Sequence, residues 1–362
     1  MFWGFVFMCK SVVTAISGGV DSSVAALLLK EQGFKTAGIT LKLFDQKKYY
    51  PNMVTSDISD DISDAKGVAE KLNIPHYVFD LSEDFEKSVI QYFVNTYLSG
   101  ATPNPCIVCN KTIKFHKLFE KAFSLAFDMV ATGHYCRLEK DKQSGRFLLR
   151  KAVDHSKDQS YVLYSLSQEQ LSRTLFPLGN YTKAQIRSLA EQNGLITAHK
   201  SDSQDICFIK DGNYRKFLES YTGKVFSKGD FVLEDNTVVG THNGLPFYTP
   251  GQRKGLGVSY YEPLYVVSKD IQNNKILLGK EKDLYSSRVI VKDVNFVSID
   301  KPCSSIRVTA KLRYKQQESP AILHPMQDYC VLEFDTPQRA VTSGQSAVFY
   351  DGEYLIGGGI IQ

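Results

Sequence analysis

The residues with the clearest capacity for chemistry form a short loop near the start of the chain, Ser-Gly-Gly-Val-Asp-Ser-Ser at positions 17–23. Residues 12–16 before it are apolar and mostly β-branched, which is typical of a buried strand, and residues 24–29 after it are mostly good helix formers. Gly18 and Gly19 therefore fall at a strand-to-helix turn, where backbone N–H groups and the helix dipole favour a phosphate. We also expect Ser22 or Ser23 to cap the helix.

This loop differs from the two most familiar nucleotide-binding loops. A Walker-type loop ends in Gly-Lys-Ser or Gly-Lys-Thr, but no lysine follows Gly19, and the Gly-x-Gly-x-x-Gly pattern of dinucleotide-binding domains is also absent here. The pattern resembles instead the pyrophosphate loop (PP-loop) of the N-type ATP pyrophosphatases, which split ATP into AMP and pyrophosphate. Adenylation of an oxygen is therefore the expected chemistry, rather than phosphoryl transfer.

Thiols form the second group of candidate residues. Cys106 and Cys109 lie three positions apart after Pro103 and Pro105, which indicates either a reactive loop or half of a metal site. A four-cysteine zinc site is not expected, because the chain has no second Cys-x-x-Cys pair. Cys207 lies in a polar segment without periodicity. The other four cysteines lie in strand-like runs and are predicted to be buried and inert, namely Cys9, Cys136, Cys303 and Cys330.

Composition limits the class of protein. The chain has 362 residues, of which 43% are hydrophobic and 23% charged, and a net charge of +4, which are ordinary values for a globular protein with a mild preference for polyanions. Seven unevenly spaced cysteines do not suit a secreted disulfide framework, so we expect a reducing, cytoplasmic location. The apolar start is too short to span a membrane, and Met8 is an alternative start site.

The first half of the chain alternates between strand and helix patterns, which predicts a parallel sheet with crossover helices. Gly33 and Asn73 are expected at helix ends, and residues 46–56 fit neither period and are expected to form a loop near the nucleotide. Two capping boxes, Ser167 with Gln170 and Thr182 with Gln185, predict further helices. The expected strands are residues 11–16, 36–43, 76–79 and 129–132, and the expected helices are residues 22–32, 57–72, 84–97 and 112–127.

Beyond residue 211 turn signals and β-branched residues dominate, so this part is predicted to be mostly β. The runs 288–297, 306–314, 331–334 and 347–349 would form a small terminal barrel. The predicted fold class is α/β followed by β. We expect three domains: residues 1–210 as the catalytic domain, 211–284 as a mostly β central domain, and 285–362 as a β-barrel.

Seven motifs, in their order along the chain, resemble one family, the tRNA-specific 2-thiouridylases, which place sulfur on C2 of the wobble uridine. These motifs are the PP-loop at 15–22, TPNPCIVCNKTIKF at 102–115, ATGHY at 131–135, KDQSY at 157–161, DSQDICF at 202–208, GQRKGLG at 251–257 and RYKQ at 313–316. The resemblance extends over almost the whole chain. It implies ATP and Mg²⁺ as cofactors, tRNAs for Lys, Glu and Gln as substrates, a sulfur-donor relay protein or cysteine desulfurase as partner, and a monomer.

The resemblance also implies roles for individual residues. Cys207 would carry a persulfide, and Cys109 would be the nucleophile that forms a transient disulfide with it, with Lys111, Lys114 or a helix N-terminus at residues 110–112 favouring the thiolate. The ATP site would comprise Ala15, Ile16, Ser17, Gly18, Gly19, Val20, Asp21, Ser22, Leu41 and Gly133, with Asp21 near Mg²⁺ or pyrophosphate. Contacts to the flipped target base and the rest of the tRNA would come from Asn104, Pro105, Cys106, His134, Lys157, Asp158, Gln159, Arg313, Tyr314 and Gln345.

One departure from the family leaves alternatives open. Many members have Asp where this chain has Cys106, so Cys106, Cys109 and Cys207 together are candidates to ligate a [4Fe–4S] cluster. His134 also fits a buried core histidine, and Lys157 and Arg313 also fit solvated surface charges. Two other functions remain: an amide- or amidine-forming adenylating ligase of the same loop class, and an RNA-binding module that uses ATP only as a switch.

Overall fold

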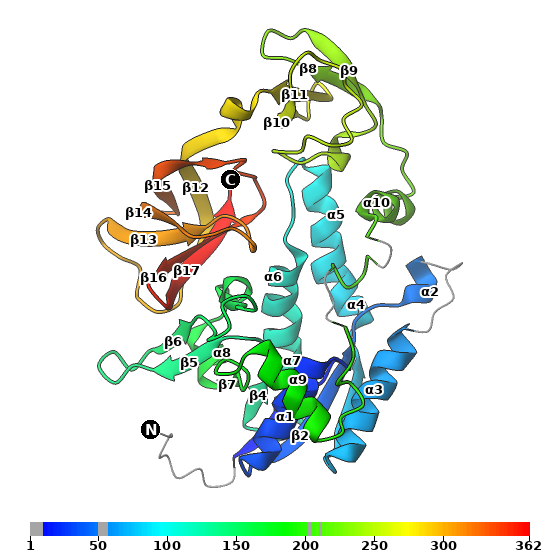
Figure 1. The fold of residues 1–362 in the computed structure, drawn as a ribbon, viewed down its shortest axis with the longest axis vertical. Helices are drawn as coiled ribbons and strands as arrows, with labels where there is room; N and C mark the ends of the chain where they lie inside the picture. Colours follow the sequence, from blue (N-terminus) through cyan, green and yellow to red (C-terminus); the bar gives the residue numbers. More distant parts are fainter. Residues whose placement is uncertain (1–9, 50–56, 202–204, 210–211) are drawn as a thin grey trace. The chain divides into compact units, whose positions relative to one another are not determined.

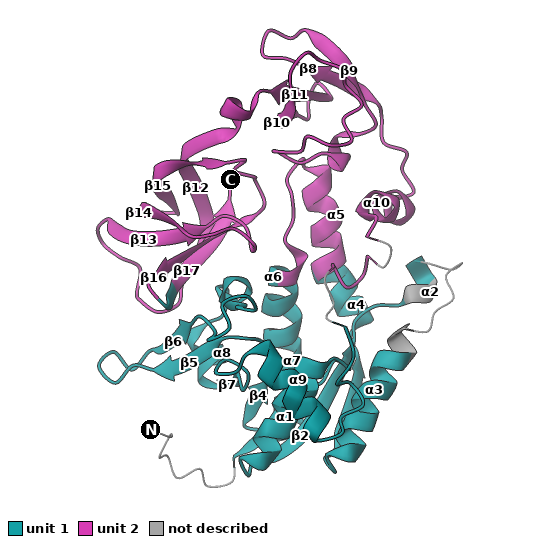
Figure 2. Ribbon diagram, viewed as in Figure 1, with its two compact units in different colours: residues 1–88, 107–204, 353–355 teal, residues 89–106, 205–352, 356–362 magenta. Residues whose placement is uncertain are grey.

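The computed structural model describes residues 10–49, 57–201, 205–209 and 212–362 (Figure 1). The described chain forms two compact units (Figure 2). Unit 1 runs to Ser88 and also includes residues 107–204 and 353–355, whereas unit 2 comprises residues 89–106, 205–352 and 356–362. The chain therefore passes between the units more than once.

A parallel sheet forms the centre of unit 1, as the sequence predicts. Its five strands run in the order β3-β2-β1-β4-β7. Because the chain proceeds from β1 outward to β3 and then returns to the opposite side of β1, the carboxyl ends of β1 and β4 form a topological switch point, where open α/β sheets bind their ligands. The strands are β1 (Ser11–Ala15), β2 (Lys35–Lys42), β3 (His76–Asp80), β4 (Met129–Ala131) and β7 (Thr174–Leu175).

Three helices share one hydrophobic core beside this sheet: α1 (Val20–Glu31), α3 (Asp57–Lys71) and α9 (Lys183–Gln192). Both predicted capping boxes are present, one at the start of α9 and one at the start of α8 (Gln168–Ser172). Gly33 and Asn73 lie after α1 and α3 with φ of +83° and +48°, as expected for residues that end helices. Unit 1 also contains the short helices α2 (Gln46–Tyr49) and η3 (Ser160–Leu163).

Two longer helical segments each contain a π-helical stretch. The first joins α4 (Ser82–Phe85), η1 (Glu86–Ile90) and α5 (Gln91–Leu98), and the second joins α6 (Pro105–Cys109), η2 (Asn110–Lys117) and α7 (Leu118–Ser124). The predicted start of the second helix at residue 112 is wrong, because Pro105 occupies its first position, where the missing N–H has no cost.

Unit 2 contains a four-stranded sheet in the order β10-β11-β8-β9. Its strands are β8 (Gly229–Val232), β9 (Val238–His242), β10 (Tyr265–Asp270) and β11 (Lys275–Gly279), with the short helices η4 (Leu245–Phe247) and η5 (Glu281–Leu284) nearby in the sequence. The sequence did not predict helix α10 (Tyr214–Thr222), which begins with an Asn213 side-chain cap and buries Phe217 and Leu218.

The predicted terminal barrel is confirmed. Its strands follow the order β12-β15-β14-β13-β16-β17, and a further pairing of β12 with β17 closes the barrel around a core that includes Leu323, Leu332 and Phe349. The strands are β12 (Tyr285–Phe296), β13 (Ile306–Lys311), β14 (Ser319–Pro325), β15 (Tyr329–Arg339), β16 (Ser346–Asp351) and β17 (Tyr354–Ile361). A hairpin of β5 (Arg137–Lys140) and β6 (Phe147–Arg150) pairs with the first residue of β17, since Tyr354 lies opposite Arg150.

Some expectations fall partly or wholly outside the described residues. The expected loop at 46–56 is wrong for residues 46–49, which form α2, and residues 50–56 are not described. The predictions for Met8 and Cys9 and for residues 202–204 of the Cys207 motif also lie outside the described residues. Across the ranges that are described, no helix is long and apolar enough to cross a membrane.

Candidate functional site

The loop between β1 and α1 lies at the switch point of the sheet in unit 1. Gly18 has φ of +77°, and a Cβ atom there would lie 2.5 Å from the backbone oxygen of Asp61, so only glycine fits. Gly133, in the loop after β4, is equally constrained, because its Cβ atom would lie 2.9 Å from the backbone nitrogen of Ser22. The loops that follow β1 and β4 therefore meet at the N-terminus of α1.

The serines of this loop stabilise it in a way that the sequence did not predict. No side chain caps α1, so the expectation that Ser22 or Ser23 caps the helix is wrong. The Ser22 hydroxyl accepts the Ser17 N–H at 3.1 Å and donates to the Gly19 carbonyl at 3.0 Å, and the Ser23 hydroxyl donates to the same carbonyl at 2.8 Å. The first N–H groups of α1 are thereby left without a side-chain cap, as a phosphate-binding helix end requires.

Asp21, in the first turn of α1, is held by two residues. Lys183 Nζ lies 2.8 Å from both carboxylate oxygens, and the Tyr135 hydroxyl donates to Asp21 Oδ1 at 2.6 Å. The Lys183 side chain is only 11% exposed, compared with 32% for Asp21. Lys183 is the first residue of α9, where the Thr182 capping box and a hydrogen bond from the Lys183 N–H to Asp154 fix the backbone. The sequence predicted Asp21 but missed Lys183 as a site residue.

The loop after β4 is ordered by residues that the resemblance assigned to tRNA. Gln159 exchanges two hydrogen bonds with the Tyr135 backbone, each 2.9 Å long, and the buried Asp158 carboxylate accepts the N–H of Ala152 and the hydroxyl of Ser160. These bonds fix the position of Tyr135, the partner of Asp21. Lys157 is half-buried beside them, and Leu41 is half-buried at the end of β2.

His134 is a buried histidine in the same loop. Its Nδ1 forms a 2.8 Å hydrogen bond with the Thr132 hydroxyl, and its ring packs against Phe115 and Phe176. Burial, followed by the nearby charge of Lys114, holds the pKa of His134 well below its ordinary value. The imidazole is therefore neutral at physiological pH, and its predicted contact with tRNA stays a prediction.

The two cysteines of the Cys-x-x-Cys pair differ in exposure. Cys106 is exposed in the first turn of α6, whereas Cys109 is only 7% exposed at its last position. Since the helix begins at Pro105, the expected helix N-terminus at residues 110–112 is wrong and cannot favour a thiolate at Cys109. The π-helical η2 begins directly after Cys109, and its Asn110 side chain donates to the Val162 carbonyl at 3.0 Å. Such π segments occur frequently at functional sites.

The segment before Cys106 is fixed within unit 2 by the turn between β15 and β16. The Gln345 side chain donates to the carbonyls of Thr102 and Pro103, both at 3.1 Å, and the Thr102 N–H donates to the Ser343 carbonyl at 2.8 Å. The Tyr92 hydroxyl is also hydrogen-bonded to the backbone of Asn104, and burial raises the pKa of Tyr92. Gln345 therefore positions the segment that contains the predicted base contacts Asn104 and Pro105.

Three other predicted residues of unit 2 differ in exposure, because Cys207 and Tyr314 are exposed and Arg313 is half-buried. Cys207 is exposed, next to Phe208, whose buried ring packs against Phe93 and Phe217. Arg313 donates to the Ala340 carbonyl at 2.6 Å and to the Thr342 hydroxyl at 2.9 Å, whereas the neighbouring Tyr314 is 40% exposed.

The remaining described cysteines test the expectation of inert, buried thiols. Cys136 and Cys330 are buried as predicted, and burial raises the pKa of both. The prediction for Cys303 is wrong, because it lies exposed in a bend before β13 rather than in a strand.

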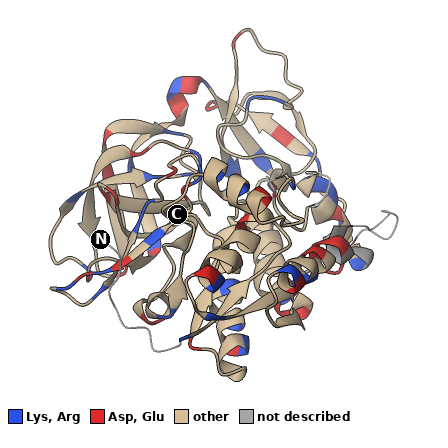
Figure 3. Cartoon of the chain, turned by 60° about the horizontal axis from the view of Figure 1, so that its bottom comes forward, with Lys and Arg blue, Asp and Glu red and all other residues tan. Residues whose placement is uncertain are grey.

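Figure 3 shows Lys and Arg interspersed with Asp and Glu along the chain. Among the described residues, no group of three His, Cys, Asp or Glu side chains gathers closely enough to hold a metal ion.

The sheet order and the loop at its switch point define the class of protein. A parallel sheet whose first strand leads through Ser-Gly-Gly-Val-Asp-Ser into an uncapped helix is the nucleotide-binding domain of PP-loop, ATP-using enzymes. Family models agree with this class along the chain. A tRNA methyl transferase HUP domain matches residues 10–211, a tRNA methyl transferase PRC-barrel domain matches residues 215–280, and an aminomethyltransferase beta-barrel domain matches residues 286–361.

Curated relatives identify the family within that class. The chain is 48% identical over 356 residues to the tRNA-specific 2-thiouridylase MnmA of Acetivibrio thermocellus, covering 98% of this chain and 99% of the relative. It is 46% identical over 358 residues to the protein of the same name in Clostridioides difficile, covering 99% of each chain. The chain belongs to the tRNA-specific 2-thiouridylase family.

A solved structure of a tRNA thiolase is only remotely similar to the chain. The U34-tRNA thiolase NcsA from Methanococcus maripaludis, described with its [4Fe-4S] cluster, has 20% sequence identity and a TM-score of 0.36, covering 59% of this chain and 70% of that one. This similarity is too low to support any argument about chemistry, and the family assignment rests on the full-length relatives.

Proposed function

We propose that this chain is an ATP-dependent tRNA-uridine 2-sulfurtransferase that replaces the C2 oxygen of the wobble uridine, U34, with sulfur. The observation that carries this proposal is the loop at residues 17–22, in a chain that matches the 2-thiouridylase family along nearly its full length. The proposed cofactors are ATP and Mg²⁺, the proposed substrates are tRNAs for Lys, Glu and Gln, and the proposed location is the cytoplasm. We also propose a monomer that receives sulfur from a relay protein or a cysteine desulfurase.

Residues of unit 1 would bind ATP and promote adenylation. The N–H groups of the loop and the start of α1 suit the phosphates, and Ala15, Ile16, Leu41 and Gly133 would complete the site. The uracil O2 would attack the α-phosphorus, which forms an O–P bond and releases pyrophosphate. Lys183 lies where its positive charge would stabilise the departing pyrophosphate, and Asp21 beside it would hold Mg²⁺. Mg²⁺ bound with ATP would neutralise further phosphate charge.

Cysteine chemistry would then supply the sulfur. The terminal sulfur of a Cys207 persulfide would attack the adenylated C2, and AMP would leave with the former O2. Attack of the Cys109 thiolate on the Cys207 sulfur would break the S–S bond, leave the terminal sulfur on the base and form a Cys109–Cys207 disulfide. A thiol reductant must then reduce this disulfide before the next turnover. The exposure of Cys207 suits delivery of sulfur by a partner.

Binding of tRNA would involve residues from both units. Asn104, Pro105 and Cys106 would contact the flipped uridine, which must leave its stack before C2 can react. The other proposed contacts are His134, Lys157, Asp158, Gln159, Arg313, Tyr314 and Gln345. We further propose the domain limits 1–210, 211–284 and 285–362, with the last domain binding tRNA.

Mass spectrometry of the wobble nucleotide tests the function. The purified chain is incubated with unmodified tRNA-Glu, ATP, Mg²⁺ and a sulfide donor, beside the variants Cys207→Ser and Cys109→Ser. Cys303→Ser is the matched control, since Cys303 is an exposed thiol outside the proposed site. We expect the wild type and the control to exchange oxygen for sulfur, and the other two variants to lose this exchange.

Other outcomes would overturn parts of the proposal. Release of AMP without sulfur incorporation would indicate an adenylating ligase, and so would full activity of a Cys109→Ser, Cys207→Ser double variant. Absence of tRNA-dependent AMP release would instead indicate an RNA-binding module. If protein purified without oxygen contains iron and loses activity when the iron is removed, an iron–sulfur cluster would replace the persulfide in the proposed mechanism.

A further inference from the structure

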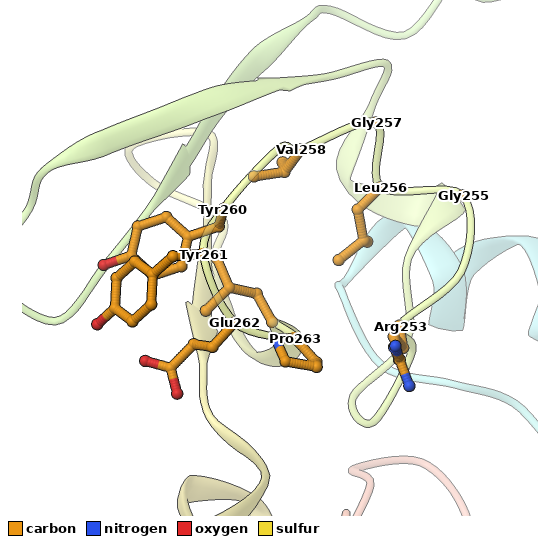
Figure 4. A pocket seen from close by; sticks show the side chains of 10 residues that line it. Arg253, Gly255, Leu256, Gly257, Val258, Tyr260, Tyr261, Glu262 and Pro263 are labelled. Carbon is orange, nitrogen blue, oxygen red and sulfur yellow. The ribbon is translucent and has the colours of Figure 1, made fainter.

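An open pocket of about 460 Å³ lies in unit 2, in the segment between η4 and β10 (Figure 4). It is formed by residues 253–264, none of which has a role in the function proposed above. Gly255 and Gly257 have φ of +75° and +69° and turn the chain sharply around it. The volume is within the range of sites that bind small ligands or single nucleotides.

Two adjacent tyrosines that line this pocket have exposed side chains. The rings of Tyr260 and Tyr261 have centroids 4.4 Å apart, and Figure 4 shows their hydroxyl groups on the same side. Tyr261 is 79% exposed and Tyr260 37% exposed. The Tyr261 hydroxyl is hydrogen-bonded to Glu262 and Tyr260, so the exposed ring is held in place. An exposed and oriented aromatic pair beside a pocket has the form of a stacking surface for a planar ligand.

The charges around the pocket favour an anion. Arg253 lines the pocket and is exposed, and Lys254 follows it in the sequence. The only carboxylate among the lining residues, Glu262, is already paired with Lys280 at 2.7 Å. Lys280 and Lys282 together hold the pKa of Glu262 below its usual range. Because Glu262 is paired with Lys280, it does not offset the charge of Arg253, which lies across the pocket from the two tyrosines (Figure 4) and suits a phosphate there.

We propose that this pocket binds a single-stranded nucleotide of the tRNA substrate, with its base stacked on Tyr261 and its phosphate near Arg253. Aromatic rings combined with a positive charge are the common means by which proteins hold unpaired nucleotides. This combination favours RNA over a protein partner, which would require a larger contact area than this pocket offers. The inference rests on the function proposed above, and it adds a tRNA contact in the central part of the sequence.

Binding of a fluorescent, unmodified tRNA-Glu transcript, measured by anisotropy, tests this pocket. Tyr261→Ala should weaken binding about tenfold through lost stacking, whereas Tyr261→Phe keeps the ring and should stay within about twofold of the wild type. Arg253→Gln should lower the slope of log Kd against log salt by about 0.7 to 0.9, which corresponds to one lost phosphate contact. Val238→Ala is the control, because Val238 is a 56% exposed residue of β9 that lies outside both the pocket and the proposed tRNA-binding barrel, and this variant should bind like the wild type.

The outcomes separate this inference from the proposed function. Wild-type protein that binds tRNA, together with Tyr261→Ala and Arg253→Gln variants that bind it equally well, would refute the pocket alone. Wild-type protein that fails to bind tRNA would refute both. Equal weakening by Val238→Ala would also refute the pocket, since the effect would then not be specific. Circular dichroism of each variant checks that it is folded, and the exposure of Tyr261 makes a folding defect unexpected.

Discussion

Lys183 and Asp21 form the ion pair on which the proposed chemistry of unit 1 most depends. The pair brings a nearly buried ammonium group to the end of the phosphate loop, where pyrophosphate would leave. A positive charge placed before the reaction stabilises a developing anion without the cost of reorienting water. The short Tyr135 hydrogen bond keeps the Asp21 carboxylate in the same place.

Replacement of this lysine should therefore affect turnover. We expect Lys183→Gln to lower kcat for AMP release with tRNA about a hundredfold, as for loss of one group that stabilises a transition-state charge. Lys183→Arg retains the charge and should recover part of the activity. Rates at saturating ATP and tRNA, with the apparent KM for each, provide the measurement. A changed KM with wild-type kcat would instead assign Lys183 to binding alone.

His134 makes stability depend on pH. Burial lowers the pKa of folded His134, so below its ordinary value of 6.5 the unfolded chain binds a proton that the folded chain does not. The free energy of unfolding should therefore fall as pH decreases below that value, with about 1.4 kcal/mol per pH unit from this group. Above it, the contribution is absent.

The variant His134→Asn isolates this effect. Urea unfolding of both proteins at about pH 7.5 and about pH 5.5 should show a smaller loss of apparent stability in the variant, because asparagine does not titrate. The difference between the two losses should be about 1 kcal/mol or more. The same loss in both proteins would mean that His134 is protonated in the folded state.

At the residue scale, local pattern predicted some side chains of the site and missed others. The glycine pattern of the loop predicts Gly18, whereas the family resemblance predicts Asp21 and Gly133, and the structure places all three at the switch point. Lys183 lies 162 positions from Asp21 in a sequence that resembles any surface helix, so no local signal assigns it to the site. Only the folded sheet brings the start of α9 to the start of α1.

The phosphate loop is an element whose shape depends on a single backbone position. Gly18 combines a positive φ with a backbone oxygen 2.5 Å from where a Cβ would lie, whereas Gly33 has φ of +83° and nothing within 4 Å. Gly33→Ala is therefore a matched control that has the conformational cost without the clash. That cost is about 1 kcal/mol.

We expect Gly18→Ala to abolish ATP-dependent AMP release and Gly33→Ala to retain it. Thermal unfolding should show a larger loss of stability for Gly18→Ala, because its clash is with the backbone of Asp61 rather than with a flexible side chain. The rate of AMP release in the presence of tRNA and ATP, and thermal melts of each variant, provide the two measurements. Equal effects of both substitutions would contradict the close approach of the loop to Asp61.

Element boundaries show why sequence analysis succeeded at some helices and failed at others. The capping boxes of α8 and α9 are local hydrogen-bond patterns, and both formed as predicted. The helix that contains Cys109 begins earlier than predicted, because two prolines close together indicate extended backbone, while Pro105 in fact starts the helix. Helix α10 has one apolar face of few residues, so the turn and strand signals around it obscured its period.

At the scale of the whole molecule, fold class was predictable but the connections between distant parts were not. Alternating helices and strands followed by a β-rich half indicate a parallel sheet and a barrel, and both are present. Closure of the barrel by β12 and β17 depends on pairing between residues such as Val291 and Ile361. Hydrophobic periodicity along the sequence cannot predict this pairing. Sequence also does not reveal that residues 353–355 belong with unit 1.

The placement of residues 353–355 has a consequence for how the protein folds during its synthesis on the ribosome. Glu353 pairs with Arg137 at 2.7 Å, and the Tyr354 hydroxyl donates to Glu139 at 2.8 Å, so the β5–β6 hairpin of unit 1 finds these partners 216 and 215 positions later in the chain. The nucleotide-binding sheet can form early during synthesis, while this hairpin must wait until β12–β16 have also been made. Translation itself thus delays completion of unit 1 until most of the barrel has emerged.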